Sequence, residues 1–262
     1  MNHEETERSE HEPEAFVPTV YQAPDDGVAT PAGLRVDQET FAQWPCIVGT
    51  PVGCTPAAGL LVVLDGRRII KRIGKFVEKG QIDPAILPVL VGIDPDNWLA
   101  DYTPWWQPAY RTEAPDFGGN APAFIADTLI PVTLAAQEAL ACPGPRRVLG
   151  YSLSTLAMIQ ALTMTDVFDE LLVASPSTWY PGFINMIERT PLACKPTTRV
   201  LVASGADEGI NEPEPIHGIR QDTDRLVATL AQRLTAPVVA AFDEKDHHSG
   251  FALRLRWLLE QA

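Results

Sequence analysis

Runs of consecutive apolar residues alternate along the chain with segments in which apolar residues follow helical spacing. Each run is bounded by glycine, proline or charged residues, a pattern typical of strands buried on both faces of a sheet. The segments between the runs predict amphipathic helices. The runs lie at 59–66, 86–93, 148–149, 171–176, 199–205 and 238–242. The clearest helical stripes are Ile125, Leu129, Val132, Ala136 and Leu140, then Ile219, Leu226, Val227, Leu230 and Leu234, and a closing helix at 251–259.

The alternation of strands and helices predicts the class of fold. It implies right-handed crossovers, and therefore an α/β fold with a mainly parallel central sheet and helices on both faces. Weaker β-type runs at 33–36 and 46–49 predict antiparallel strands at one edge of that sheet. No proline-rich linker or change of composition divides the chain, so we expect a single domain over residues 15–262. Residues 1–14 are polar and acidic, and we expect a disordered N-terminal arm there.

The segment 146–157 predicts a strand that turns abruptly into a helix, with Ser152 at the apex. Such a nucleophile elbow projects the serine hydroxyl clear of the backbone, and the helix N-terminus beneath it favours developing negative charge. The N–H of Leu153 is then one candidate donor to an oxyanion. The usual elbow pattern is Gly-x-Ser-x-Gly, whereas Ser154 stands at the last position here. The alternative is that Ser152 is only a helix N-cap.

Polar residues with catalytic potential follow several of the predicted strands. In a parallel sheet the ligand site lies beyond the carboxyl ends of the strands, so these residues should converge. They are Asp65-Gly66-Arg67, Ser152, Asp207-Glu208 and Asp246-His247-His248. Their chain order of oxyanion loop, serine, acid and histidine is that of the α/β-hydrolases. A serine hydroxyl needs a base to take its proton, and that histidine needs a carboxylate to orient it.

Each of these residues also has a non-catalytic interpretation. The acidic pair could be a solvated turn, and the histidine pair a surface feature or a weak metal site. No third ligand lies at zinc-type spacing, so we expect no metal and no cofactor. The aromatic residues that follow the run at 86–93 either line a ligand cleft or pack a loop onto the domain. These aromatic residues are Trp98, Tyr102, Trp105, Trp106 and Tyr110.

Five short segments also resemble the esterase D-like α/β-hydrolases, the group that contains the enterobactin and salmochelin esterases. The segments are 64–66, 91–93, 101–104, 150–153 and 174–179. The most specific is Ser-Pro-Ser-x-Trp, which this chain carries at 175–179. The resemblance begins at about Cys46 and continues to the C-terminus, and it implies the α/β-hydrolase fold.

The resemblance also selects among the candidate residues. It implies His247 rather than His248 as the base, Glu208 rather than Asp207 as the acid, and the N–H of Arg67 beside that of Leu153 as the oxyanion hole. Two features depart from the family. Ser154-Thr155 replace two glycines of the elbow, and Trp98-Leu99-Ala100 stand where the family often has an arginine. The substrate is therefore left open beyond a carboxylic ester, with a siderophore lactone or an aryl ester among the options.

Composition limits the partners and the compartment. The hydrophobic fraction of 45% is ample for a sizeable core. The formal net charge of −14 argues against nucleic acid or an anionic membrane as a partner. No apolar run reaches the length that crosses a bilayer, and the acidic first residues are unlike a secretory signal. The four cysteines are sparse and include no Cys-x-x-Cys pair, which is typical of reduced thiols in a cytoplasmic protein.

These observations predict a serine hydrolase that cleaves a small-molecule carboxylic ester through an acyl-enzyme. Ser152 is the predicted nucleophile, His247 the base and Glu208 the orienting acid. Two alternatives remain open. The altered elbow is compatible with a non-catalytic ligand-binding protein on the same fold, and the acyl-enzyme could pass its acyl group to an alcohol instead of water.

Overall fold

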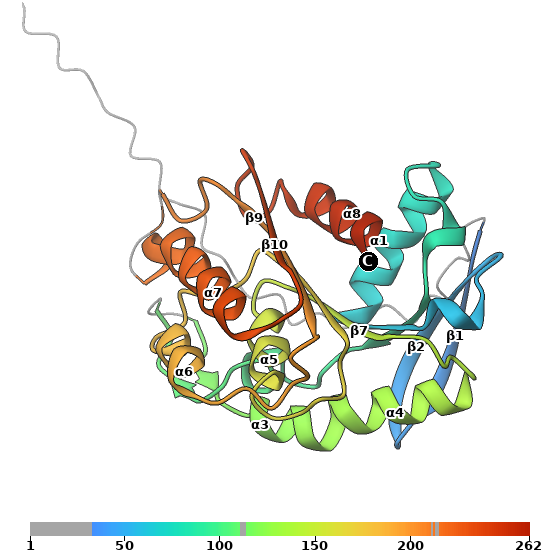
Figure 1. Cartoon of the computed structure of the whole chain (residues 1–262), viewed down its shortest axis with the longest axis horizontal. Coiled ribbons are helices and arrows are strands. Elements are labelled where there is room, and N and C mark those ends of the chain that lie inside the picture. The colour runs from blue at the N-terminus through green and yellow to red at the C-terminus, as the bar shows by residue number, and fades with distance from the viewer. Residues whose placement is uncertain (1–32, 111–113, 211, 213–214) are drawn as a thin grey trace, which may run out of the picture.

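The structure is a computed structural model that describes residues 33–110, 114–210, 212 and 215–262. The arm predicted for residues 1–14 lies outside these described residues. An eight-stranded sheet forms the centre of the molecule, in the order β1-β2-β4-β3-β7-β8-β9-β10 (Figure 1). Its strands are β1 (Leu34–Phe41), β2 (Trp44–Pro51), β3 (Leu60–Leu64), β4 (Val89–Ile93), β7 (Arg146–Tyr151), β8 (Glu170–Ala174), β9 (Arg199–Gly205) and β10 (Val238–Asp243).

The neighbouring strands β4, β3, β7, β8, β9 and β10 run parallel to one another. By contrast, β2 is antiparallel to both β1 and β4. The mainly parallel α/β sheet and the antiparallel strands at one edge are therefore confirmed. All five residues of β3 are buried, and so are all five of β4. Burial on both faces explains why these strands appear in the sequence as continuous apolar runs.

Helices cover both faces of the sheet (Figure 1). On one face, α1 (Gly66–Glu78) and α8 (Phe251–Gln261) pack against Leu61 and Val63 of β3 in one apolar cluster. Leu60 and Val62 of the same strand belong to the cluster on the opposite face. The helices of that second face are α3 (Ala121–Phe124), a π-helical turn (Ile125–Leu129), α4 (Ile130–Ala139), α5 (Ser154–Ala161), α6 (Phe183–Arg189) and α7 (Ile219–Arg233).

Two sequence predictions need correction. The run at 86–93 is a strand only from Val89, because Ile86 ends a 3₁₀ turn (Pro84–Ile86) and Pro88 follows it. The segment after β4 is not only a loop, since it contains α2 (Trp98–Asp101) and β5 (Trp106–Gln107). The second strand of this small antiparallel pair is β6 (Phe117–Gly118). Two further 3₁₀ turns lie at Pro56–Ala58 and Ile216–Gly218.

The aromatic residues after β4 do not share one environment. Tyr102 is buried against Phe124, and Trp105 packs edge-on against Tyr180. Trp98 and Trp106 are exposed. Packing onto the domain therefore accounts for Tyr102 and Trp105, the two that are withdrawn from solvent.

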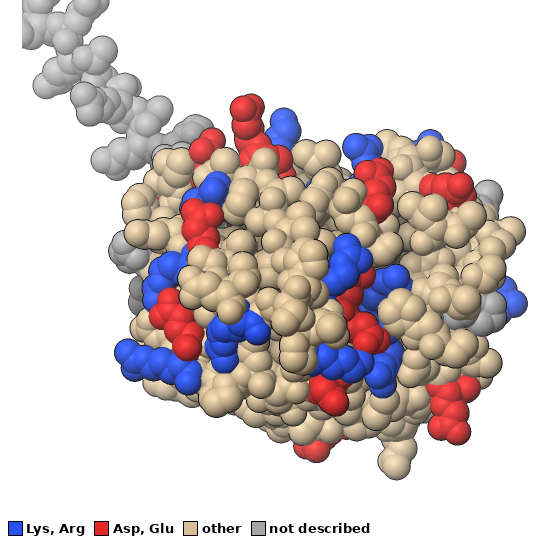
Figure 2. Space-filling model, in the orientation of Figure 1, with Lys and Arg blue, Asp and Glu red and all other residues tan. Residues whose placement is uncertain are grey.

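The distribution of surface charge, the length of the helices and the state of the cysteines bear on the predicted partners and compartment. On the face shown in Figure 2, basic and acidic side chains are interspersed and neither sign forms one large patch. Within the described part of the chain, no helix is both long and apolar enough to cross a membrane. All four cysteines are free thiols, and the cytoplasmic location predicted from them stays a prediction.

Candidate active site

The turn after β7 places Ser152 at the apex between a strand and a helix, as the sequence predicts. Ser152 has a φ of 59°, in the left-handed region, and its N–H donates to the carbonyl of Ala174 at the end of β8 (3.0 Å). Leu153 is the N-cap residue of α5. A non-glycine residue in this conformation costs about 1–3 kcal/mol and persists only where its surroundings hold it. Such strain at a strand-to-helix turn is typical of a nucleophile elbow.

Ser154 fits the elbow through a pair of hydrogen bonds to one residue. Its hydroxyl accepts the N–H of Tyr151 and donates to the carbonyl of Tyr151, both at 2.9 Å. β3 pairs with β7 only as far as Leu149, so the hydroxyl supplies an acceptor for an N–H beyond the ladder. The close approach explains the glycine at position 150, where a Cβ would lie 2.7 Å from the sulfur of Met158. Serine in place of the usual glycine is therefore compatible with a close-packed elbow.

Ser152, His247 and Glu208 form a continuous hydrogen-bonded relay. Nε2 of His247 lies 2.9 Å from Oγ of Ser152, and Nδ1 lies 3.2 Å from Oε2 of Glu208. Glu208 follows β9, and His247 lies in the loop between β10 and α8. The neighbouring candidates Asp207 and His248 are exposed and make neither contact. With Nδ1–H donating to the carboxylate, Nε2 is free to accept the serine proton.

Glu208 is held as a buried carboxylate, with only 3% of its surface exposed. Burial by itself raises the pKa of this group. The hydrogen bond from His247, the charges of His247 and Arg254, and the N–H of Gly205 at 3.0 Å together bring the pKa below its usual value. Glu208 is therefore ionised at neutral pH and able to orient the imidazole.

Tyr151 supports the histidine from the side of the sheet. Its hydroxyl donates to the carbonyl of His247 at 2.8 Å, and the two ring centroids lie 5.0 Å apart. Burial raises the pKa of this phenol, so it stays a neutral donor. The guanidinium carbon of Arg68 lies 5.1 Å from the centre of the tyrosine ring. Sequence reasoning missed Tyr151, because a tyrosine before a serine has no distinguishing pattern.

The loop after β3 carries the second candidate oxyanion donor, the N–H of Arg67. In the structure this N–H donates to both carboxylate oxygens of Asp94, each at 3.2 Å. Asp94 follows β4, and burial raises the pKa of its carboxyl group. A Cβ on Gly66 would lie 2.2 Å from Cα of Gly92, so the two glycines allow the loop to approach β4. The Arg67 amide thus has an acceptor from the chain itself, whereas Leu153 lies at a helix end, where N–H groups have no partner within the helix.

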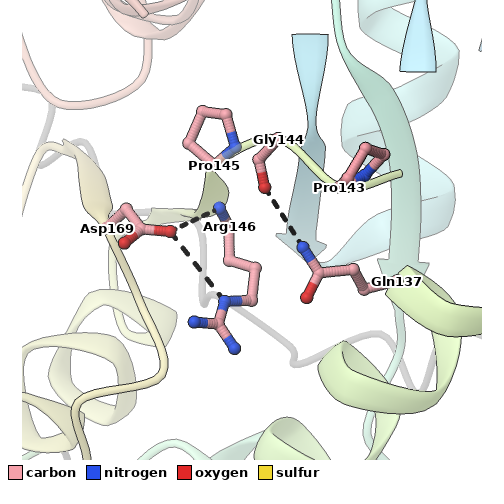
Figure 3. Close-up of a pocket in the computed structure, with 6 residues that line it drawn as sticks. All are labelled: Gln137, Pro143, Gly144, Pro145, Arg146 and Asp169. Atoms are coloured by element: carbon pink, nitrogen blue, oxygen red, sulfur yellow. Dashed lines mark hydrogen bonds and ion pairs between the residues drawn. The ribbon is translucent and has the colours of Figure 1, made fainter. Parts of the chain in front are cut away.

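A hollow of the described surface lies away from this relay. It has a volume of about 590 Å³ and is lined by the six residues shown in Figure 3. One of them, Arg146, begins β7, whereas Ser152 follows the opposite end of that strand. The polar groups there are paired with one another: Arg146 with Asp169, and the side chain of Gln137 with the carbonyl of Gly144. A structural role at the foot of the sheet accounts for these contacts.

Arg254 is the other functional candidate that sequence reasoning missed. It lies on α8, is 1% exposed, and contacts both Glu208 and Asp243. A signal for it does exist in the sequence. Arg254 follows Phe251 by three positions and precedes Leu258 by four, so a charged residue falls on the apolar stripe of the closing helix. Among the described residues, no group of three or more His, Cys, Asp or Glu side chains could hold a metal ion.

Comparisons with known proteins agree with this architecture. No family model matches the chain. Over 183 residues the chain is 32% identical to the uncharacterized protein YbbA of Bacillus subtilis (strain 168), covering 65% of this chain and 72% of YbbA. An IroE-like serine hydrolase from Shewanella oneidensis superposes with a TM-score of 0.69 at 16% identity, over 87% of this chain and 79% of that one. The siderophore hydrolase EstB from Aspergillus nidulans gives 0.56 at 18% identity, over 93% and 95% of the two chains. At these identities the two superpositions show a shared fold.

Proposed function

The chain belongs to the same family as YbbA and has the α/β-hydrolase fold of the siderophore esterase-like hydrolases, and from this premise we propose that it is a serine carboxylic ester hydrolase. The observation that carries the proposal is the relay from Ser152 through His247 to Glu208, with the serine at the apex of an elbow. An N-cap serine alone would need neither a histidine within 2.9 Å nor a buried carboxylate behind that histidine. The partner of the protein is a small-molecule ester, and no cofactor enters the reaction.

The proposed reaction proceeds through an acyl-enzyme. Oγ of Ser152 attacks the ester carbonyl while Nε2 of His247 takes its proton, and Glu208 stabilises the imidazolium. The tetrahedral oxyanion accepts a hydrogen bond from the N–H of Leu153, and from that of Arg67 when this N–H leaves the carboxylate of Asp94. When this intermediate collapses, His247 gives the proton to the departing alkoxide, and the alcohol leaves. His247 then takes a proton from water, and the water oxygen attacks the acyl carbon to form a second oxyanion. As the bond between that carbon and Oγ breaks, His247 returns the proton to Oγ of Ser152 and the carboxylic acid departs.

The structural neighbours suggest which esters to try first. EstB is described as a siderophore hydrolase, so a siderophore lactone is one candidate, and aryl esters are a second. The absence of the family's arginine near Trp98, Leu99 and Ala100 favours a broad panel over a single substrate. Trp98 is exposed on α2 and cannot replace the charge of that arginine.

A fluorophosphonate probe tests the proposed activity without knowledge of the natural substrate. We expect one equivalent of probe to label Ser152, because only a serine with a general base reacts readily with this electrophile. Peptide mapping by mass spectrometry identifies the labelled residue. An unlabelled protein would instead support the ligand-binding alternative. With an aryl ester and an added alcohol, an ester product in place of the acid would indicate acyl transfer.

The contact between Arg67 and Asp94 leads to a prediction about the oxyanion hole. We expect Asp94→Ala to raise kcat/KM for a neutral aryl ester by about threefold to tenfold, where tenfold is about 1.4 kcal/mol. The Asp94 carboxylate accepts the hydrogen bond of the Arg67 N–H and would repel an oxyanion. Its removal therefore frees this N–H to donate to the oxyanion. Because the carboxylate also caps the start of α1, the free energy of unfolding should fall by about 1 kcal/mol. Steady-state kinetics and melting curves measure both effects.

Asp83→Ala is the matched control, since Asp83 caps the 3₁₀ turn Pro84–Ile86 through the N–H of Ala85 at 2.9 Å. It should lower stability without changing kcat/KM. A fall in kcat/KM for Asp94→Ala alone would mean that the carboxylate holds the Arg67 amide in position, contrary to this prediction.

A further inference from the structure

A single buried arginine connects the acid of the relay to the loop that carries the histidine. Arg254 is 1% exposed, and it is among the largest fully buried side chains of the described residues. Its Nη1 donates to Oε1 of Glu208 and, at 2.7 Å, to Oγ of Ser175. Its Nε and Nη2 donate to the two carboxylate oxygens of Asp243, at 2.7 and 2.9 Å, in a bidentate contact. A buried arginine is costly unless its donors are satisfied, and these contacts satisfy them from opposite sides.

The same guanidinium also binds the main chain of the histidine loop. Nη2 donates to the carbonyl oxygens of Lys245 at 2.7 Å and Asp246 at 3.0 Å, and Nη1 lies 3.4 Å from the carbonyl of His247. Three successive carbonyls of the loop therefore converge on one cation. These contacts fix the path of the loop from which the imidazole projects.

Two glycines make the space that the guanidinium occupies. A Cβ on Gly250 would lie 2.2 Å from Nη2 of Arg254, and a Cβ on Gly205 would lie 2.7 Å from the same atom. Gly205 ends β9, and its N–H donates to Oε1 of Glu208 at 3.0 Å. Oε1 is thus held by Arg254 and Gly205 together, which leaves Oε2 to face Nδ1 of His247.

We propose that Arg254 is a positioning residue for the ester hydrolysis proposed above: it aims Glu208 at His247, holds the His247 loop, and balances the charge of the buried carboxylates. The inference rests on that proposed function. Arg254 touches neither Ser152 nor the reacting atoms, so it acts through Glu208 and the loop. Glu208 and Asp243 carry two negative charges and Arg254 one positive charge. The remaining single negative charge matches the imidazolium that forms as Ser152 is deprotonated.

The charge balance gives a sign for the pH dependence. His247 must be unprotonated and Glu208 ionised for the relay to work, so protonation of the relay gives the acid limb of the rate profile. Loss of the Arg254 cation leaves the buried carboxylates uncompensated, which favours protonation of the relay and moves the acid limb to higher pH. The other titratable or charged groups around His247 are Tyr151 of β7, Arg68 of α1 behind it, and Asp246 and His248 of its own loop.

Arg254→Met and Arg254→Lys test the proposal, with Asp243→Asn as the matched control. Asp243 binds the same guanidinium on the side away from Glu208. We expect Arg254→Met to lower kcat by at least about thirtyfold with KM within about threefold, and to move the acid limb up by about one pH unit. Arg254→Lys keeps the charge but cannot bind Asp243 and Glu208 with several nitrogens at once. Its kcat should therefore fall by about tenfold, while the acid limb stays at the wild-type pH. Asp243→Asn removes a negative charge, so it should not move the acid limb of the rate profile to higher pH.

A double-mutant cycle separates positioning from general loss of structure. In a Glu208→Gln background, Arg254→Met should cost less than about a further threefold in kcat, because both changes disable the same unit. Melting curves identify variants that are simply unfolded, and if Arg254→Met does not fold, the Lys variant carries the test. The proposal is overturned if the two effects multiply and the acid limb of the Arg254→Met variant stays in place.

A measurement without turnover keeps this inference distinct from the proposed function. Proton NMR detects the Nδ1–H of a histidine hydrogen-bonded to a carboxylate as a low-field resonance. We expect that resonance in the wild type and in Asp243→Asn, and its loss or broadening in Arg254→Met. If Ser152 is not labelled by the probe but the resonance still depends on Arg254, the hydrolase proposal fails and the positioning of His247 stands. If the resonance is unaffected in a folded Arg254→Met variant, the positioning role is wrong.

Discussion

Replacing Ser152 by alanine is expected to reduce ester hydrolysis on the order of a thousandfold or more, because the members of such a relay act as a unit. Oγ of Ser152 is the atom that Nε2 of His247 contacts, at 2.9 Å, whereas the hydroxyl of the neighbouring Tyr151 is bonded to the main-chain carbonyl of His247. The alanine keeps the backbone turn, whose N–H remains bonded to the carbonyl of Ala174. The free energy of unfolding should therefore change by less than about 1 kcal/mol.

The measurement is kcat on an aryl ester, together with labelling by a fluorophosphonate probe and a melting curve. Thr163→Ala is the matched control, since it removes a hydroxyl that bonds to Gln160 at the far end of the same helix, α5. This control should retain full activity. A Ser152→Ala variant that keeps a tenth of the wild-type rate would place the nucleophile elsewhere.

The central strands could be predicted from the sequence because burial on both faces leaves a direct pattern. β3 and β4 appear as uninterrupted apolar runs for that reason, and β9 has the bounds expected from its run at 199–205. The elbow could be predicted for a different reason. A chain that reverses from strand to helix within a few residues needs a small residue at Gly150, where the structure leaves no room for a Cβ.

The helix that precedes β7 shows where the pattern is insufficient. Its apolar stripe predicts an ordinary α-helix, whereas the structure has a π-helical turn at Ile125–Leu129 between α3 and α4. Pro131 follows this turn and has no N–H to continue the helical ladder. The apolar spacing is nearly the same in both geometries, so hydrophobic periodicity could not distinguish them.

The sequence pattern could identify the segments that carry the site residues, but it could not by itself decide between neighbouring candidates. The sequence places Glu208 next to Asp207, and which of the two points inward depends on the turn after β9. In the structure Glu208 is 3% exposed and Asp207 is exposed to solvent. The contacts of Arg254 with Glu208 and of Asp94 with Arg67 join segments far apart in the chain. Neither contact has a local sequence pattern, although the charge on the apolar stripe of α8 indicates that Arg254 is unusual.

The two adjacent histidines should differ sharply when each is replaced by alanine. Only His247 reaches both Ser152 and Glu208, at 2.9 and 3.2 Å. The ring of His248 is exposed and lies edge-on to that of His247, with the centroids 5.1 Å apart. Partial desolvation by the surrounding loop, although the residue stays accessible to solvent, and the neighbouring charge of His247 lower the pKa of His248, so it is mostly neutral at pH 7 and its loss removes little charge.

We therefore expect His247→Ala to lower kcat on the order of a thousandfold, as Ser152→Ala does, and to abolish labelling by the probe. His248→Ala should keep kcat within about fivefold, because this exposed side chain contacts neither Ser152 nor Glu208. Added imidazole should partly restore the rate of His247→Ala, since the truncation leaves room for a soluble base beside Oγ of Ser152. The same addition should have no effect on Ser152→Ala, which lacks the atom to be activated. If His248→Ala were the inactive variant, the base would lie one residue further along the loop, and the contact between His247 and Ser152 would not be catalytic.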